Sequence, residues 1–341
     1  MQAIVFHGTH QLALEEVPEP KPAPGEVLVQ VAACGICGSD LHGYLGHSPR
    51  RDRSVPLIMG HEFTGRVAAL GSDVAVNLAV GERVVVHPQI SCGRCRACRT
   101  GLTNICPNMS ILGIERAGAF AEYVAVPADR LFRLPAHLSD LDGALVETLS
   151  IQVHLFRQVP RPLLRTVVVL GAGPQGLFAV QLARLAGASQ IIATDIIPHR
   201  LELAAQMGAT TVLPGDQNVV ARVLELTDGW GADFIVDAVG ASATRRQGIA
   251  ALAPGGTLGL VGLLPGETSV EFNAVVNREL TLRGSYSCTD DDMARSLELL
   301  AGRQIQLTGM LALAPLREGV SCFERLLDPT SGLTKVVLQP N

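Results

Sequence analysis

The sequence predicts an α/β protein of two domains, a small β barrel followed by a parallel, doubly wound sheet. Three observations predict this fold. Residues 1–147 contain short β-type runs between Gly and Pro turns, which suits a small barrel. After Pro162, continuous apolar runs alternate with helical segments, which indicates a parallel sheet. A Gly-rich turn joins the first of those runs to its helix.

The elements follow from these patterns in chain order. In the first domain, short strands are expected at 27–31, 65–68 and 83–86, each next to a Pro-Gly, Gly-Ser-Asp or Gly-Glu turn. The run at 166–170 is apolar throughout, as in a strand buried on both faces. The remaining expected strands are 190–194, 233–237, 257–261, 280–284 and 335–338, and the expected helices are 177–186, 200–207, 243–252 and 291–301.

Composition limits the classes of function. The 341 residues are 48% hydrophobic and 17% charged, and their net charge of −5 argues against an electrostatic nucleic-acid interface. The start of the chain, Met1 to Phe6, lacks the basic flank and apolar core of a signal peptide, and no apolar run reaches the length of a membrane span. We therefore expect a cytoplasmic protein, in which thiols stay reduced and clustered cysteines indicate a metal.

Four cysteines lie close together, at Cys92, Cys95, Cys98 and Cys106. Their thiolates can converge on one ion, as a closed structural zinc site requires, so residues 88–110 are expected to form a zinc lobe. A disulfide framework is disfavoured because the other cysteines are scattered and nothing indicates secretion, and a redox centre usually needs a single CxxC pair. Arg94, Arg96 and Arg99 leave a nucleic-acid zinc ribbon as an alternative to a solvated loop.

A dinucleotide fingerprint, GxGxxG, follows the buried strand at 166–170 and precedes a helix. Its glycines permit a tight turn and close approach of a pyrophosphate to the helix N-terminus. Asp195 ends the next strand, where a carboxylate can accept both ribose hydroxyls and repel a 2′-phosphate, so NAD is favoured over NADP. Arg200 could contact the ribose or a phosphate. The expected cofactor-binding residues are Gly171, Gly173, Pro174, Gln175, Gly176, Asp195 and Arg200.

A second set of metal-type residues precedes the zinc lobe. Cys37, His61 and a carboxylate could bind one ion and leave a position open, as a catalytic zinc requires. Cys34 forms a CxxC pair with Cys37, but a small buried neighbour explains it better than a disulfide oxidoreductase does. Cys288 and Cys322 are interpreted as buried thiols, although Cys288 could border a substrate pocket.

Taken together, these motifs resemble those of the zinc-dependent medium-chain dehydrogenase/reductases, and the resemblance runs from Met1 to Leu338. The resemblance rests on CGxCGSDxH from Cys34, Gly60-His61-Glu62, the four-cysteine lobe, Gly118 to Tyr123, GAGPQG and Pro254-Gly-Gly256. It implies a GroES-like barrel of residues 1–147, interrupted by a Rossmann NAD-binding domain of 148–285, with 286–341 returning to the first domain. The active site is then expected in the cleft between the domains.

The same resemblance implies residue roles. Cys37, His61 and Glu62 match the catalytic-zinc segments, and Glu147 matches the acidic zinc-site residue of the sorbitol and threonine dehydrogenase branch; which glutamate binds zinc directly stays open. Asp40 matches the carboxylate that orients the zinc-bound histidine. Ser39 and His42 match a proton relay. Two departures are Thr148, where the branch usually has Pro, and Ser285 to Cys288, where sorbitol dehydrogenases carry an Arg-Tyr pair.

The implied activity is oxidation of a secondary alcohol in a polyol or sugar alcohol to a ketone, with zinc polarising the oxygen and NAD accepting hydride. Alternative substrates for the same zinc and NAD mechanism are a hydroxy amino acid such as threonine, an amino-cyclitol or a sugar-alcohol phosphate. Residues 50–53, rich in Arg, could bind a substrate anion or form a solvated loop. A non-enzymatic nicotinamide-binding protein is an alternative of another class. The resemblance implies a homodimer or homotetramer.

Overall fold

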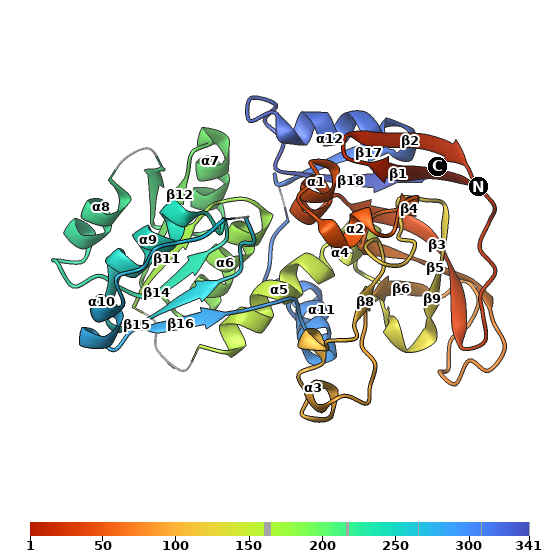
Figure 1. The fold of residues 1–341 in the computed structure, drawn as a ribbon, viewed down its shortest axis with the longest axis horizontal. Coiled ribbons are helices and arrows are strands. Elements are labelled where there is room, and N and C mark those ends of the chain that lie inside the picture. The colour runs from red at the N-terminus through yellow and green to blue at the C-terminus, as the bar shows by residue number, and fades with distance from the viewer. Residues whose placement is uncertain (160–164, 216–217, 265, 308, 341) are drawn as a thin grey trace. The chain divides into compact units, whose positions relative to one another are not determined.

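A computed structural model describes residues 1–159, 165–215, 218–264, 266–307 and 309–340 (Figure 1). The chain divides into two compact units. Unit 1 comprises Met1–Ser150, Cys288–Arg303 and Met310–Asn341, and unit 2 comprises Ile151–Ser287 and Gln304–Gly309. Helix α5 (Val146–Arg157) runs across the first division between them. The predicted α/β fold class, with a barrel-type β domain and a parallel-sheet domain, is confirmed.

Unit 1 is built around a seven-stranded sheet of order β10-β6-β5-β3-β18-β17, in which β9 also pairs with β3. Its central strands β3 (Glu26–Gly35), β5 (Glu62–Leu70) and β18 (Lys335–Gln339) come from distant parts of the chain. Gly35 pairs with both Glu62 and Val337, so three segments meet at one end of the sheet. The other strands are β6 (Arg83–Val86), β9 (Tyr123–Pro127), β10 (Leu131–Arg133) and β17 (Leu311–Pro315).

Smaller elements complete unit 1. The expected strands at 27–31, 65–68 and 83–86 lie within β3, β5 and β6, and the expected helix at 291–301 lies within α11. A three-stranded sheet has the order β2-β1-β4, and β7 pairs with β8. The bounds are β1 (Gln2–Gly8), β2 (Gln11–Glu16), β4 (Leu57–Ile58), β7 (Gln89–Ile90), β8 (Ser110–Ile111), α1 (Gly38–Tyr44), α2 (Pro49–Asp52), α3 (Arg96–Arg99), α4 (Asp140–Ala144), α11 (Asp290–Ala301) and α12 (Gly319–Leu327).

Unit 2 is a six-stranded parallel sheet of order β13-β12-β11-β14-β15-β16. The strand order reverses between β11 and β14, which is where ligands bind in open α/β sheets, at the carboxyl ends of the strands. The bounds are β11 (Thr166–Leu170), β12 (Gln190–Asp195), β13 (Thr211–Pro214), β14 (Ala232–Asp237), β15 (Leu252–Leu260), β16 (Thr281–Gly284), α6 (Pro174–Leu185), α7 (Pro198–Gln206), α8 (Val219–Leu226), α9 (Ser242–Ala251) and α10 (Phe272–Asn277).

The apolar strands of unit 2 are buried as their sequence predicts. Val168, Ile192, Ile235 and Leu258 lie side by side on β11, β12, β14 and β15 and belong to one core cluster. Because helices cover a parallel sheet on both faces, such strands need no polar face. Among the described residues, no helix is both long enough and apolar enough to cross a lipid bilayer.

A short segment, Gln304–Gly309, belongs to unit 2, whereas the family resemblance predicts that all of residues 286–341 return to the first domain. The cause is the buried side chain of Gln181 on α6. Its Nε2 donates to the carbonyl oxygen of Gln306 at 3.0 Å, and its Oε1 accepts from the Gln306 N–H at 2.7 Å. A buried amide needs partners, and this backbone supplies both of them.

Candidate active site and metal centres

The four lobe cysteines converge on one point. The Sγ atoms of Cys95 and Cys98 are 3.5 Å apart, those of Cys95 and Cys106 3.8 Å, and those of Cys92 and Cys98 4.0 Å. Four thiolates at about 2.3 Å from zinc would be separated by about 3.8 Å, whereas a disulfide requires about 2.05 Å. All eight cysteines are free thiols. The lobe therefore has the geometry of a structural zinc site.

Hydrogen bonds from the local backbone orient these thiols toward one another. Cys95 is the N-cap of α3, and its Sγ accepts from the Cys98 N–H at 3.5 Å. The Cys92 N–H donates to Cys106 Sγ at 3.4 Å. Backbone N–H groups of Arg94 and Cys95 lower the pKa of Cys92 to about 6, which favours the thiolate that a metal needs. Helix α3 lies outside the barrel strands in Figure 1.

A second centre lies inside the barrel domain. One ligand-type atom from each of Cys37, His61 and Glu62 lies within 4.8 Å of the other two. Cys37 is the N-cap of α1, and its Sγ accepts from the Ser39 N–H at 3.5 Å. Glu62 is the first residue of β5 and His61 directly precedes it, and the partner strand β3 leads into Cys37. His61 is 6% exposed and Glu62 is fully buried.

Asp40 lies directly behind His61. Its Oδ1 is 3.4 Å from His61 Nδ1, and its Oδ2 accepts from the Cys37 N–H at 3.0 Å. Burial opposes the charge of Asp40, but His61 and Arg51 hold the pKa of this carboxyl below its usual value. Burial alone lowers the pKa of His61, whereas Asp40 and Cys37 raise it well above 6.5. The groups around the imidazole thus favour a positive charge on or next to the ring. A bound metal ion would supply that charge in place of a proton.

Glu62 is held by a buried lysine. Its Oε2 accepts from Nζ of Lys335, the first residue of β18. Burial lowers the pKa of Lys335, but Glu62 and Cys37 raise it above the usual value, so the ammonium stays charged. Gly35 makes room for this pair, since a Cβ there would lie 3.0 Å from Lys335 Cε and would collide with the Glu62 carboxylate. Glu62 Oε1 is buried and has no partner among the described residues.

Glu147 stands near this group without belonging to the set of three. It lies in the first turn of α5 and is 5% exposed, and its Oε2 is buried with no partner in the described chain. Burial, with Glu62 adding to it, raises the pKa of Glu147 to about 7, against the opposing effect of His61. Thr148, where the resembling branch usually has Pro, is helical in α5.

The donor set fits zinc. It combines a thiol, an imidazole and buried carboxylates, and two carboxylate oxygens, Glu62 Oε1 and Glu147 Oε2, have no partner in the described part of the chain. Buried unpaired acceptors are costly unless a cation or a donor meets them. Asp40, behind the imidazole, supplies the outer partner that metal-binding histidines usually have. Cys37, His61 and Glu62 would hold the ion, with Glu147 available as a further acidic ligand.

Ser39 and His42 lie on α1, beside this centre. Ser39 Oγ is 3.3 Å from His61 Nε2. His42 is one turn further along the helix, with its ring 6.2 Å from that of His47. Burial, then His47 and Arg51, lower the pKa of His42, so its imidazole is neutral at physiological pH. Its Nδ1 is buried without a partner in the described chain and can accept a proton.

The Gly-rich turn of unit 2 forms a cradle between β11 and α6. Gly171 has φ +91°, and a Cβ there would lie 2.5 Å from Val239 Cγ2. Gly173 is the N-cap of α6 and has no side chain to cap it, and Pro174 occupies the first turn. The free N–H groups of this helix end are an anion site. Gln175 lies beside the cradle, its Oε1 accepting from Gln152 Nε2 at 2.8 Å.

Asp195, at the end of β12, points toward the same turn. Its Oδ2 accepts from the Ala172 N–H at 2.7 Å, and its Oδ1 accepts from the Ile197 N–H at 2.9 Å. Arg200 Nη1 lies 4.0 Å from Asp195 Oδ2, and also 4.0 Å from where a Cβ of Gly173 would be. The carboxylate is thus fixed next to the cradle.

Comparison with known proteins agrees with this geometry. Residues 23–136 match the family model described as alcohol dehydrogenase GroES-like domain, and residues 174–302 match the one described as zinc-binding dehydrogenase. The chain is 34% identical to sorbitol dehydrogenase of Bacillus subtilis, over 100% of this chain and 98% of that protein. This chain belongs to the zinc-dependent medium-chain dehydrogenase/reductase family, in its polyol and threonine dehydrogenase branch.

Two further relatives bear on this dehydrogenase. L-threonine 3-dehydrogenase of Bacillus subtilis is 37% identical over 98% of this chain and 96% of that protein. A zinc-binding dehydrogenase from Sinorhizobium meliloti, solved with bound NADP, superimposes with a TM-score of 0.90 at 32% identity, covering 99% of each chain. The family prediction made from the motifs is confirmed.

Some residues around the sites of the dehydrogenase were missed by sequence reasoning. The sequence predicts Lys335 only as the start of a strand, yet its ammonium pairs with Glu62. A lone lysine that opens an apolar run was the available signal. Arg51, from the Arg-rich stretch 50–53, is 1% exposed and contacts Asp40, so it is not available to a substrate anion. Cys288 and Cys322 are buried thiols, and Cys288 Sγ lies 3.6 Å from His87 Nε2.

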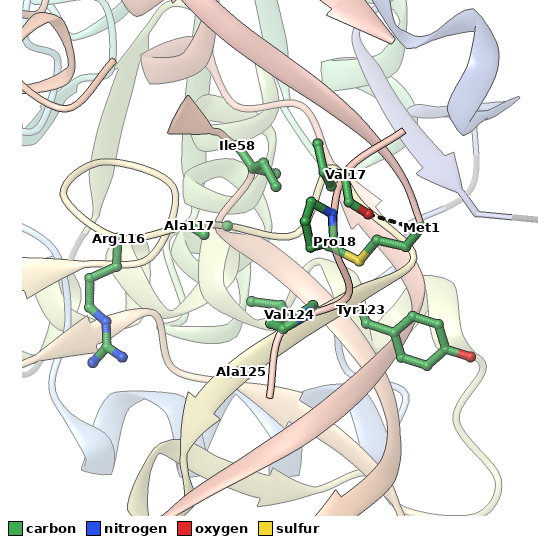
Figure 2. A pocket seen from close by; sticks show the side chains of 11 residues that line it. Met1, Val17, Pro18, Ile58, Arg116, Ala117, Tyr123, Val124 and Ala125 are labelled. Carbon is green, nitrogen blue, oxygen red and sulfur yellow. Dashed lines mark hydrogen bonds between the residues drawn. The ribbon is translucent and has the colours of Figure 1, made fainter. Parts of the chain in front are cut away.

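A surface pocket of about 260 Å³ lies elsewhere in unit 1 (Figure 2). Its walls are mostly apolar and include Val17, Pro18 and Val124, and the Met1 amino group donates to the Val17 carbonyl oxygen at 2.8 Å. Arg116 and Tyr123 provide its polar edge. No metal-type residue of the dehydrogenase lines it, so it is not the candidate active site.

Proposed function

We propose that the protein oxidises a secondary alcohol of a polyol or sugar alcohol to a ketone, with NAD as hydride acceptor. The observation that carries this proposal is the grouping of Cys37, His61 and Glu62 with Asp40 behind the imidazole. Bound at this group, zinc would act as a Lewis acid that lowers the pKa of the alcohol. The nicotinamide carries the redox step.

The remaining roles belong to the chain itself. Asp40 fixes the His61 ring so that its Nε2 faces the site. Ser39 takes the proton released from the alcohol, because its hydroxyl lies 3.3 Å from that Nε2. His42 then accepts the proton, since its lowered pKa keeps the ring neutral and its Nδ1 is unpartnered among the described residues.

NAD rather than NADP is part of the proposal. The Asp195 carboxylate is fixed beside the Gly-rich turn by two backbone N–H donors, and its charge opposes a 2′-phosphate. Arg200 is close enough to offset that charge in part, and the Sinorhizobium meliloti relative was solved with NADP. Cofactor choice is therefore to be measured directly with both nucleotides.

The substrate class rests on relatives and on Glu147. The sorbitol dehydrogenase relative supports a polyol, and Glu147, whose buried Oε2 has no partner among the described residues, stands where that branch carries an acidic zinc-site residue. The threonine dehydrogenase relative supports a second candidate, a hydroxy amino acid. Ser285 to Cys288 stand where sorbitol dehydrogenases carry Arg and Tyr, so sorbitol itself is not assumed.

A substrate panel tests the proposal. NADH formation is followed with polyols, inositols, amino-cyclitols, sugar-alcohol phosphates, threonine and simple secondary alcohols. A polyol is expected to give the highest kcat/KM, and the activity is expected to vanish on zinc removal. Highest kcat/KM with threonine would favour the second candidate, and zinc-independent turnover, or none with any alcohol, would contradict the proposal.

We also propose a cytoplasmic homodimer or homotetramer. β16 is an edge strand, and Phe272 and Val276 expose 66% and 71% of their surface one turn apart on α10. Large exposed apolar side chains next to an open strand edge favour association. Light scattering should give two or four chain masses for the wild type and a smaller mass for Val276→Asp. A monomeric wild type would contradict this part of the proposal.

A further inference from the structure

Arg51 is a buried cation with a specific set of partners. Its side chain is 2% exposed, although it lies in an Arg-rich segment whose neighbours Asp52 and Arg53 are exposed. A guanidinium stays charged in proteins, and burying it without partners is very costly. The segment 50–53 therefore folds so that one arginine is taken out of water. The partners of that arginine show what it does there.

The guanidinium donates to three residues. Nε donates to the Gly113 carbonyl oxygen at 3.2 Å, and Nη1 donates to the Ser39 carbonyl oxygen at 2.7 Å. Nη2 donates to Asp40 Oδ1 at 2.9 Å and lies 3.4 Å from Ser39 Oγ. Each nitrogen of the fork thus has its own acceptor, an arrangement that only the planar, five-donor guanidinium provides.

Ser39 and Asp40 belong to the segment of Cys37, and Gly113 packs against the segment of His61. Asp40 Oδ1 is the atom that lies 3.4 Å from His61 Nδ1, and Asp40 Oδ2 accepts from the Cys37 N–H. Gly113 packs against Gly60, the residue before His61, so closely that a Cβ on Gly113 would lie 2.8 Å from the Gly60 carbonyl oxygen. One side chain therefore contacts the Cys37 segment directly and the His61 segment through Gly113.

We propose that Arg51 is a positioning residue that holds the Cys37 and His61 segments together and thereby sets the affinity of this centre for zinc. This inference rests on the proposed function. The hydrogen bonds of Arg51 described above go to Gly113, Ser39 and Asp40 rather than to the candidate ligands themselves. Outer partners of metal ligands typically contribute about 10–100-fold in metal affinity, and Arg51 fixes such a partner, Asp40, at its Oδ1.

Gly43 offers an independent way to displace Arg51. A Cβ at Gly43 would lie 2.6 Å from Arg51 Cδ, so even alanine pushes the guanidinium out of place without removing its charge. Gly43 lies inside α1 and is not among the glycines with positive φ, and alanine is the better helix former. The Gly43→Ala variant should therefore lose affinity for zinc only through the displacement of Arg51.

The test measures zinc release from the purified holoenzyme against a competing chelator, with the four-cysteine lobe as an internal reference. Arg51→Met and Gly43→Ala should each weaken one of the two zinc ions by about 10–100-fold and leave the other as in the wild type. Arg51→Lys keeps the positive charge but not the planar fork of donors, so its zinc affinity should lie between those of Arg51→Met and the wild type. Arg53→Met removes an exposed arginine from the same segment and should behave as the wild type.

The outcomes separate this inference from the function. If Arg51→Met and Gly43→Ala release zinc as the wild type does, or loosen both ions equally, Arg51 has no positioning role. If Arg51→Met does not fold, Gly43→Ala decides alone. A wild type that binds zinc only at the four-cysteine lobe would contradict the proposed function and this inference together. If the wild type binds two zinc ions and the variants release both as the wild type does, only this inference is contradicted.

Discussion

The two cysteine-containing centres of unit 1 are built in different ways. The lobe takes all four ligand atoms from residues 92–106, and backbone N–H groups of the same loop aim the thiols. The other centre takes Cys37 from the N-cap of α1 and His61 and Glu62 from the entry into β5, and surrounds them with buried charges from α2, α5 and β18. A local loop is sufficient to bind a metal for stability. A centre that performs chemistry requires the whole barrel.

The difference lies mainly in what surrounds the ligands. Around Cys37, three buried carboxyl groups, Asp40, Glu62 and Glu147, face two buried cations, Arg51 and Lys335. The lobe has no such buried ion pairs among the described residues, and its arginines are exposed. Its ion is therefore expected to stabilise the fold rather than to tune reactivity.

The largest expected effect is that of Cys95→Ser on stability. Zinc binding at a closed four-thiolate site contributes directly to folding, so the loss of one thiolate should lower Tm and the yield of folded protein far more than it lowers kcat of the molecules that remain folded. Thermal unfolding, zinc content and NADH formation are measured together. A Cys95→Ser protein with unchanged Tm and two zinc ions would contradict the structural assignment.

The next effect concerns the proton relay near Cys37. His42→Ala should lower the rate of alcohol oxidation by about 10²-fold, the lower end for acid–base groups, because buffer can replace the imidazole. Burial, His47 and Arg51 lower the pKa of His42, so the wild-type ring is a base above that pKa and loses this role as pH falls through it. The variant should be most impaired between that pKa and about pH 8, where the wild-type ring is a base and hydroxide is scarce, and added imidazole should rescue it in part.

Zinc and NAD binding serve as controls for His42→Ala and should be unchanged. A pH–rate profile that coincides with that of the wild type would leave His42 with a structural role only. The lobe provides no equivalent of this effect, since its four ligand-type residues are cysteines and include no histidine.

A smaller effect is expected at the cofactor. Asp195→Ser removes the ribose acceptor and the negative charge opposed to a 2′-phosphate, while Arg200 remains close by. We expect kcat/KM with NAD to fall about 10-fold and that with NADP to rise, which corresponds to one charged hydrogen bond of about 1.5 kcal/mol. The measurement is kcat/KM with both nucleotides. A wild type that prefers NADP, or an unaltered preference, would contradict this assignment.

How much the sequence predicted follows the same division. Motifs within one segment, the four cysteines and GAGPQG, could be interpreted directly because their spacing fixes their geometry. The apolar strands of unit 2 were predictable because each is buried on both faces. The pairing of Lys335 with Glu62 and the burial of Arg51 were not predictable from local pattern, since they depend on the register of β18 against β3 and on the packing of Gly113 against Gly60.

The most direct test of the central claim is the zinc content, Tm and activity of Cys37→Ser, set beside Cys95→Ser. Cys37→Ser is expected to keep the lobe zinc and a Tm near that of the wild type, yet to form NADH at least about 10³-fold more slowly, because a Lewis acid supplies several kcal/mol to the reaction. A Cys37→Ser protein that retains wild-type activity, or that unfolds as readily as Cys95→Ser, would contradict it.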